Sequence, residues 1–234
     1  MAPNPSLRFI LSNFGYIIDF KKVVIANCKH FCVCIVIILA LLSVASCTDP
    51  EYKHLPQKDI DSDELLKHIV PEKLVQYWQL EDVPGYKDGE AYQLLFSKGN
   101  IGRNKIPDYS KDTINMNGFF RGCMPSFCVY RIRHLLNNKW QTVDSEEHLK
   151  EFVGQIDNEY EAFIIAKLNN FEVDSLNEGN GFIKTEDGYI LKVMKYRSCP
   201  KSKESFTIFI TKNGELKNIK SQGYYLKTKD CVIS

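Results

Sequence analysis

The stretch FTIFITKNGELKNIK, residues 206–220, carries the clearest structural signal in the sequence. Two segments that are predicted as strands, 206–211 and 215–220, flank Asn213 and Gly214. An Asn-Gly pair favours the two-residue turn that joins antiparallel strands, because both residues tolerate positive φ. The stretch therefore predicts a β-hairpin.

Two further hairpins are expected upstream. Residues 181–185 and 189–196 flank an acidic Glu-Asp-Gly turn, and residues 127–136 and 139–143 flank a pair of asparagines. The strands after residue 180 follow one another along the chain through short turns. They predict a four-stranded antiparallel meander at the C-terminus.

Two helices are expected between the first hairpin and the meander. Asp144 and Glu147 are placed to cap the first helix, and its apolar residues recur at i, i+3, i+4 and i+7, as on one face of a helix: Leu149, Phe152, Val153 and Ile156. The second helix, about 159–169, contains the apolar run AFIIA and should be largely buried.

The part before residue 127 is expected to be poorer in strands. A helix should begin at Asp61 or Ser62, with Glu64 placed for a capping box. A second short helix is expected from Pro71 through Trp78, because proline suits a first helical position. The glycine-rich stretch that follows is interpreted as loops around a single strand, 91–96.

The expected fold is therefore α+β, with short helices packed on a C-terminal antiparallel β-meander and stabilised by disulfides. Residues 62–234 are expected to form a single globular domain, with a loop-rich helical part (62–126) and a helix-plus-sheet part (127–234). Residues 47–61 are polar and contain two prolines, which is typical of a tether.

The segment FCVCIVIILALLSVA, residues 31–45, has fifteen residues and no charge. A bilayer-spanning helix needs roughly 20 apolar residues, whereas the core of a signal peptide needs about 7–15. Lysines precede the segment, as in a signal peptide. Residues 1–46 are thus expected to be a cleaved signal peptide, and the long stretch before the apolar core suggests a translation start assigned too far upstream. The alternative is an uncleaved signal-anchor.

Val44-Ala45-Ser46-Cys47 resembles the lipobox of bacterial lipoproteins. The resemblance implies that the Cys47 thiol is joined to diacylglycerol, that the chain is cut before Cys47, and that the new amine is acylated with a fatty acid such as palmitate. More than one acyl chain is what stable anchoring in a bilayer requires. The next residue is Thr48, not the aspartate that resembles an inner-membrane retention signal, so we expect the outer membrane of the cell envelope, with the body in the periplasm or at the surface.

Eight cysteines are present. Three lie in the predicted signal peptide, and Cys47 would be blocked by lipid, which leaves an even number for an oxidising compartment: Cys123, Cys128, Cys199 and Cys231. Of the three possible pairings we favour Cys123–Cys128 with Cys199–Cys231. A redox role for the first pair is the weaker interpretation, because its spacing is C-x4-C and because Cys128 shares an apolar strand face with Tyr130 and Ile132.

The stretch 158–219 is similar in pattern to PepSY and cystatin-like domains, which are small helix-on-sheet modules of secreted bacterial proteins. The similarity lies in the order of a helix and successive strands, with DGYILKV and TKNGELKNI as strand sequences. It implies a module that binds or inhibits a partner. It transfers no functional residue to this chain.

No residue pattern indicates catalysis, a cofactor or a metal. Phosphate-binding, dinucleotide-binding, nucleophile-elbow and zinc-protease motifs do not occur. The histidines after residue 47 have no metal-ligand spacing: His54, His68, His134 and His148. The acidic clusters 144–147 and 157–161 are attributed to helix N-termini, where negative charge is favourable.

Two surface features have competing interpretations. The lysine-rich stretch 212–229, interleaved with Tyr224 and Tyr225, either binds anionic surfaces or glycans or is simply a solvated sheet face. Trp78 and Trp140 would mark a contact surface if they were exposed.

The formal net charge of +1 gives no electrostatic footprint for nucleic acid. We therefore expect a non-enzymatic lipoprotein that is bound to the bilayer through Cys47 and that binds an envelope protein, a glycan or a ligand. The alternatives are an envelope hydrolase whose site forms only in three dimensions and a structural envelope component.

Overall fold

The computed structural model describes residues 51–84, 92–106, 117–120 and 128–231. The description below concerns the compact unit Pro50–Ser234. Within the described ranges, none of the helices combines the length and the apolar character needed to cross a membrane. The apolar segment 31–45 and Cys47 lie outside the described residues.

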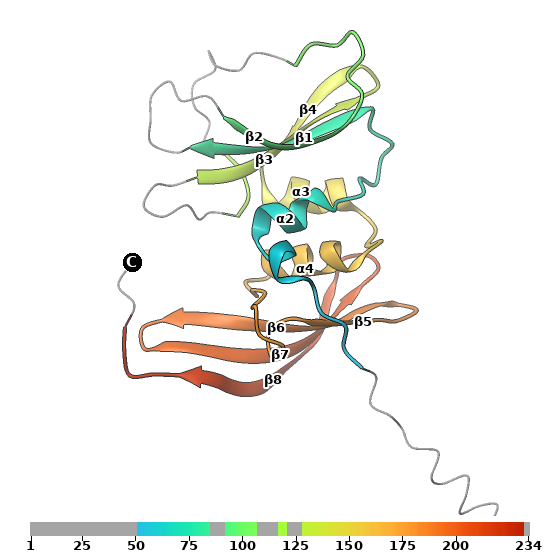
Figure 1. Cartoon of the computed structure of the whole chain (residues 1–234). Coiled ribbons are helices and arrows are strands. Elements are labelled where there is room, and N and C mark those ends of the chain that lie inside the picture. The colour runs from blue at the N-terminus through green and yellow to red at the C-terminus, as the bar shows by residue number, and fades with distance from the viewer. Residues whose placement is uncertain (1–50, 85–91, 107–116, 121–127, 232–234) are drawn as a thin grey trace, which may run out of the picture. The chain divides into compact units, whose positions relative to one another are not determined.

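The first sheet contains four antiparallel strands in the order β2-β1-β3-β4 (Figure 1). Its strands are β1 Tyr77–Pro84, β2 Gln93–Gly99, β3 Cys128–Leu136 and β4 Lys139–Val143. The turn between β3 and β4 is made by Asn137 and Asn138, which have φ of 51° and 60°. Asparagine tolerates this left-handed conformation better than most residues, which explains the hairpin.

The second sheet is an antiparallel meander in the order β5-β6-β7-β8. Its strands are β5 Gly181–Lys184, β6 Gly188–Ser198, β7 Lys201–Thr211 and β8 Leu216–Lys227. The predicted meander is therefore confirmed, and the hairpin between β7 and β8 turns at Asn213 and Gly214. Gly214 adopts a φ of 73°, which favours glycine.

The helices lie between the two sheets (Figure 1). They are the 3₁₀ helix η1 Gln57–Asp59 and the α-helices α2 Ser62–Lys67, α3 Glu146–Val153 and α4 Glu159–Leu168. A capping box begins α4: the Asn158 side chain accepts from the Glu161 N–H at 3.0 Å, and the Glu161 carboxylate accepts from the Asn158 N–H at 3.3 Å. Glu161 also accepts from the Val70 N–H at 2.7 Å, which ties the segment after α2 to α4.

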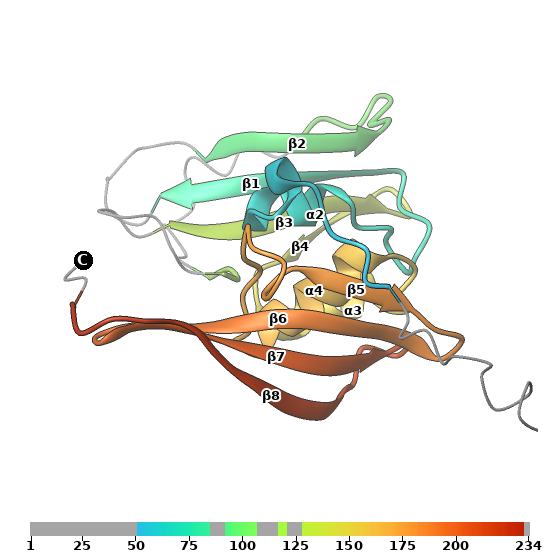
Figure 2. The ribbon, with the colours of Figure 1, turned by 60° about the horizontal axis from the view of Figure 1, so that its bottom comes forward.

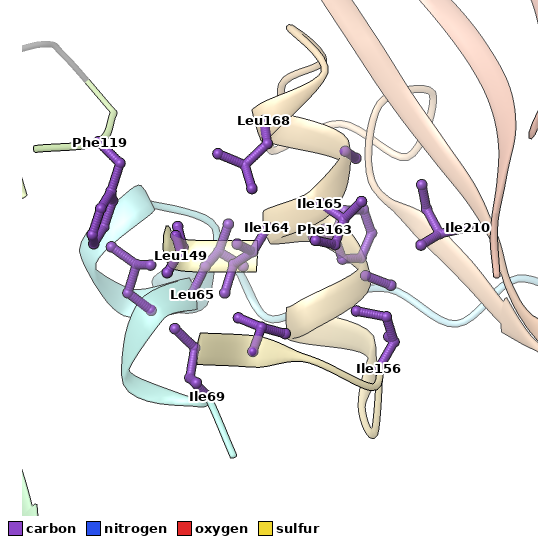
Figure 3. Close-up of a cluster of buried hydrophobic side chains, with 14 of the residues drawn as sticks. Leu65, Ile69, Phe119, Leu149, Ile156, Phe163, Ile164, Ile165, Leu168 and Ile210 are labelled. Carbon is purple, nitrogen blue, oxygen red and sulfur yellow. The ribbon is translucent and has the colours of Figure 1, made fainter. Parts of the chain in front are cut away.

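One continuous apolar core runs from the second sheet through α4 to α2, α3 and the first sheet (Figure 3). Phe163 is directed towards Ile210 of β7, whereas Ile164 is directed towards Leu65 of α2. Because neighbouring residues on α4 face different partners, the helix is apolar on nearly all sides, as expected of a buried helix. The sequence run AFIIA thus has the predicted role.

The structure corrects the prediction in the part before residue 127. The helix expected from Pro71 through Trp78 is wrong, because Tyr77 and Trp78 begin strand β1. The single strand expected at 91–96 is present as β2, but it pairs with β1, so strands are not confined to the C-terminal part. The α+β class holds, with two four-stranded sheets and few short helices in place of helices on one meander.

The helix starts differ slightly from expectation. The helix predicted at Asp61 or Ser62 is α2, but the Asp61 side chain makes no capping hydrogen bond, so the predicted capping box is absent. The N-cap of α3 is Ser145, one residue after the expected Asp144, and its hydroxyl accepts from the His148 N–H at 3.1 Å.

Candidate functional site

A pocket of about 290 Å³ opens between the first sheet and α3. We call it the His134 pocket. Its volume is at the small end of the range for small-molecule sites, about 300–1,000 Å³. Its lining residues come from β3, β4, α3 and the segment between α2 and β1: Lys73, Val75, His134, Gln141, Thr142, Val143, His148, Glu151 and Phe152.

The β3–β4 hairpin and α3 build this pocket together. His134 lies directly opposite Gln141 in the β3–β4 register, and it shares the helix-facing side of β3 with Ile132. The buried side of α3 packs into the core through Leu149, Phe152 and Val153. Phe152 also lines the pocket, together with His148 and Glu151 of the same helix.

His134 is the most unusual residue of the pocket. Only 7% of the residue is exposed, and its ring packs on Phe152 with centroids 5.0 Å apart. Its Nδ1 atom is buried and has no hydrogen-bond partner among the described residues. Burial, assisted by the positive charge of Lys73, lowers the pKa of the imidazole below its ordinary value of 6.5. The ring is thus neutral at physiological pH.

The rim of the pocket supplies the charged groups. His148 Nδ1 lies 3.0 Å from a carboxylate oxygen of Asp144, one helical turn earlier, and the side chain of His148 is about half exposed. Lys73 and Glu151 add a cation and an anion to the lining. Together with the amide of Gln141 they offer donors and acceptors, which suits a small polar molecule that carries both kinds of group.

A second group of polar residues lies on the other face of the first sheet and forms a closed ion-pair network. Glu81 is fully buried, and its Oε2 atom accepts from Arg131 Nη2 at 2.9 Å and from Nε at 3.1 Å. Its Oε1 atom contacts Arg133 Nε and the Gln79 amide. The carboxylate is fully occupied by these donors, so the network is interpreted as structural.

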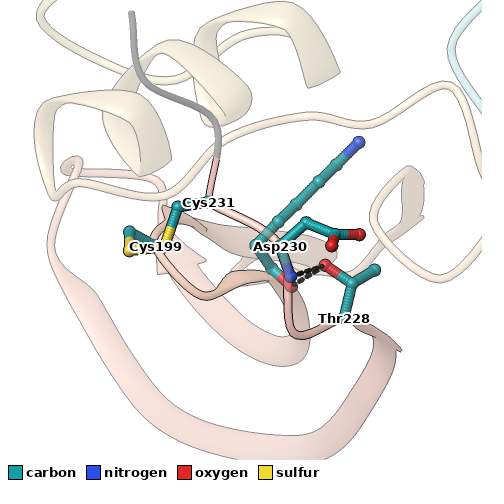
Figure 4. The surroundings of a disulfide bond; sticks show 5 residues. Cys199, Thr228, Asp230 and Cys231 are labelled. Carbon is teal, nitrogen blue, oxygen red and sulfur yellow. Dashed lines mark hydrogen bonds between the residues drawn. A yellow bond between two sulfur atoms is a disulfide. The ribbon is translucent and has the colours of Figure 1, made fainter.

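The disulfide between Cys199 and Cys231 has the predicted pairing (Figure 4). The chain before Cys231 also pairs with the start of β7, since Lys201 N–H donates to the Asp230 carbonyl at 2.8 Å and Thr228 N–H donates to the Lys201 carbonyl at 2.9 Å. Cys128 is disulfide-bonded as well. Its predicted partner, Cys123, lies outside the described residues, as does Cys47.

The remaining predicted histidines do not converge with His134. His54 contacts the Asn180 carbonyl, and the ring of His68 stacks on Tyr160 with centroids 3.7 Å apart. In the described part of the chain, no three His, Cys, Asp or Glu residues are grouped so that they could hold a metal ion.

The tryptophans are not exposed anchors. Trp78 is 2% exposed and lies in the core, and Trp140 packs edge-on against Tyr77 while its Nε1 donates to the Lys105 carbonyl at 3.0 Å. The acidic clusters do lie at the N-termini of α3 and α4, as predicted.

The sequence indicated His134 and His148 only as separate residues. One sequence signal could have brought the two histidines together. The predicted hairpin is followed closely by a predicted helix, which places α3 against the β3–β4 hairpin. The sequence did not indicate that Lys73 lines the pocket, because the segment that carries it was predicted to be helical.

No protein family, no curated protein and no solved structure matches this chain. The pocket is therefore interpreted from its own geometry.

Proposed function

We propose that the protein is a bacterial lipoprotein, anchored in the cell envelope through acylated Cys47, whose body binds a small polar ligand in the His134 pocket. The single observation that supports ligand binding is the buried Nδ1 atom of His134, which lacks a partner within the described residues. An unsatisfied buried polar group costs about 1–3 kcal/mol. A ligand or an ordered water that reaches this pocket and bonds the imidazole would recover that energy.

The anchor is supported by the sequence pattern alone. The lipobox-like residues end at Cys47, immediately after an apolar segment of signal-peptide length. The outer membrane remains the favoured location, because Thr48 follows the cysteine. An envelope protein or glycan stays open as a further partner.

A second candidate, an envelope hydrolase, is favoured by the His148–Asp144 contact at 3.0 Å. A carboxylate that orients a histidine is a familiar part of a general base. The described surroundings of His134, however, contain no group hydrogen-bonded to its ring, and no hydroxyl is bonded to the ring of His148 within the described part of the chain. Binding therefore explains the pocket with fewer assumptions.

The anchor is tested by intact-mass analysis of the full chain expressed in a bacterial host, beside Cys47→Ala. We expect a mass that begins at Cys47 with added acyl chains and that disappears in the variant. An unmodified chain that retains residues 31–46 would contradict the anchor.

Ligand binding is tested by thermal-shift measurements with a panel of amino acids, dicarboxylates and monosaccharides. At least one of these should stabilise the wild type and the matched control His68→Phe, but not His134→Phe. His68 is the suitable control because its exposed ring stacks on Tyr160 away from the pocket. If no compound distinguishes His134→Phe from the control, the pocket does not bind these classes of ligand. Hydrolysis of an added ester or peptide that depends on His148 would instead favour the hydrolase.

A further inference from the structure

The second sheet has one face that carries no helix. The other face packs on α4, whereas no helix covers this side in either view of the molecule (Figures 1 and 2). Ile183, Ile190 and Phe209 are direct cross-strand partners on β5, β6 and β7, and none of them belongs to the apolar core. We call this side the outer face and define it by six residues: Ile183, Ile190, Lys192, Phe209, Lys217 and Lys220.

The outer face is positively charged around its half-buried apolar row. On β8, Lys217 is the cross-strand partner of Phe209 and so extends the apolar row. Beside this row, Thr207 of β7 pairs with Lys192 of β6 on one side and with Lys220 of β8 on the other. Lys217 Nζ lies 2.7 Å from a carboxylate oxygen of Glu215, so this lysine is partly neutralised. Lys192 and Lys220 have no carboxylate partner among the described residues.

An ion pair bounds the outer face farther along the strands. Lys203 Nζ lies 2.7 Å from a carboxylate oxygen of Asp174, and the Tyr225 hydroxyl donates to the same carboxylate at 2.6 Å. This pair is neutral in sum. The positive charge of the outer face therefore comes from the lysines beside the apolar row.

The N-terminal chain of the body joins this face. Lys53 pairs through its backbone with Phe182 at the edge of β5. The ring of Tyr52 packs on Gly181, since a Cβ atom added to this glycine would lie 3.1 Å from the ring. The centroid of the same ring is 4.1 Å from Lys192 Nζ. Cys47 is five residues before Tyr52, so even an extended chain spans no more than about 18 Å between them.

We propose that the outer face docks on the anionic phospholipid surface of the membrane that holds the acyl chains, an inference that rests on the proposed lipidation of Cys47. Each basic residue near an anionic surface strengthens binding about fivefold, and half-buried Ile and Phe side chains at the surface suit the headgroup boundary. The short tether keeps the face at a high effective concentration beside the lipid, so individually weak contacts suffice. Tyr52, five residues after Cys47, holds this part of the chain on the same face.

The test is lysine labelling of the acylated full-length protein in three environments: detergent, vesicles of phosphatidylcholine, and vesicles of equal parts phosphatidylcholine and phosphatidylglycerol. An amine-reactive acetylating reagent and mass spectrometry report the labelling rate of each lysine. On the anionic vesicles we expect Lys192 and Lys220 to react several-fold more slowly than in detergent. Lys98 and Lys139, which are exposed on the first sheet, should keep their rates.

A charge-reversal pair makes the test specific. Lys192→Glu/Lys220→Glu should remove the protection of Lys217, whereas the matched control Lys98→Glu/Lys139→Glu should preserve it. If Cys47 carries acyl chains by intact mass and the outer-face lysines still react as in detergent, docking is overturned while the anchor stands. Equal protection on neutral vesicles would overturn the electrostatic part. An unmodified Cys47 would remove the tether and overturn both proposals.

Discussion

Replacing Glu81 by glutamine should destabilise the fold by about 3 kcal/mol, the lower end of the cost of breaking a buried ion pair. The Glu81 side chain is 0% exposed, that of Arg133 is 1% exposed and that of Arg131 is 15% exposed. Glutamine keeps the shape and one acceptor oxygen, but it removes the negative charge that accepts from Arg131 and Arg133. At about 2–4 °C per kcal/mol for a chain of this size, the midpoint of thermal unfolding should fall by about 6–12 °C.

The measurement is equilibrium unfolding in urea, followed by circular dichroism with the disulfides oxidised. Glu215→Gln is the matched control, because it breaks the ion pair with Lys217 on the surface, where both side chains are more than half exposed. Solvent screens such a pair, so the control should unfold at the wild-type urea concentration. A wild-type midpoint for Glu81→Gln would show that the arginines are hydrated and that the buried-network reasoning is wrong.

Three further predictions concern other parts of the body. Cys199→Ser/Cys231→Ser should lower stability by about 3–4 kcal/mol, because the bond closes a loop with a sequence separation of 32 residues; urea unfolding would test this, and reduction of the wild type, which also opens the Cys128 disulfide, should cost at least as much. Gly188→Ala should destabilise the β6–β7 pairing, since an added Cβ would overlap the Ile210 carbonyl oxygen; a loss of no more than a few tenths of a kcal/mol in the same assay would contradict the geometry. Below pH 6.5 His134 is protonated in the unfolded chain, whereas burial keeps it neutral in the folded chain. The free energy of unfolding should therefore decrease as the pH falls from 6.5 to the lowered pKa of the folded state. Urea unfolding at several pH values should show a smaller decrease for His134→Phe.

The C-terminal meander was predictable because local signals decide it. Asn213 and Gly214 fix the last hairpin, and the alternation of apolar residues fixes which side of each strand faces the core. The same holds for α4, whose capping residue Asn158 and apolar run leave no competing interpretation. These elements need no information from distant parts of the chain.

Strand β1 was not predictable in the same way. Its core residues, Trp78 and Leu80, alternate with Gln79 and Glu81, which looks like a strand with one solvated face or like the end of a helix. In the structure Glu81 is buried because Arg131, fifty positions later, neutralises it. Such a pairing is a property of the assembled sheet, and it cannot be read from either segment alone.

The His134 pocket was only partly predictable for a related reason. The placement of His134 on the helix-facing side of β3 follows from the alternation with Ile132. Its lack of a hydrogen-bond partner within the described residues depends on which side chains from α3 and from the segment before β1 reach it. That is decided by packing across three elements.

The position of α4 between the two sheets has a consequence for cooperativity. The second sheet packs on α4, α4 packs on α2 and α3, and α3 packs on β4 of the first sheet, so all of them belong to one continuous core. The two sheets should therefore melt in one transition, and a lesion in either should weaken hydrogen-exchange protection in both. Among the described residues the two sheets share no hydrogen-bonded strand pair, so the contacts of α4 with α2 and α3 are what join them into one unit of folding.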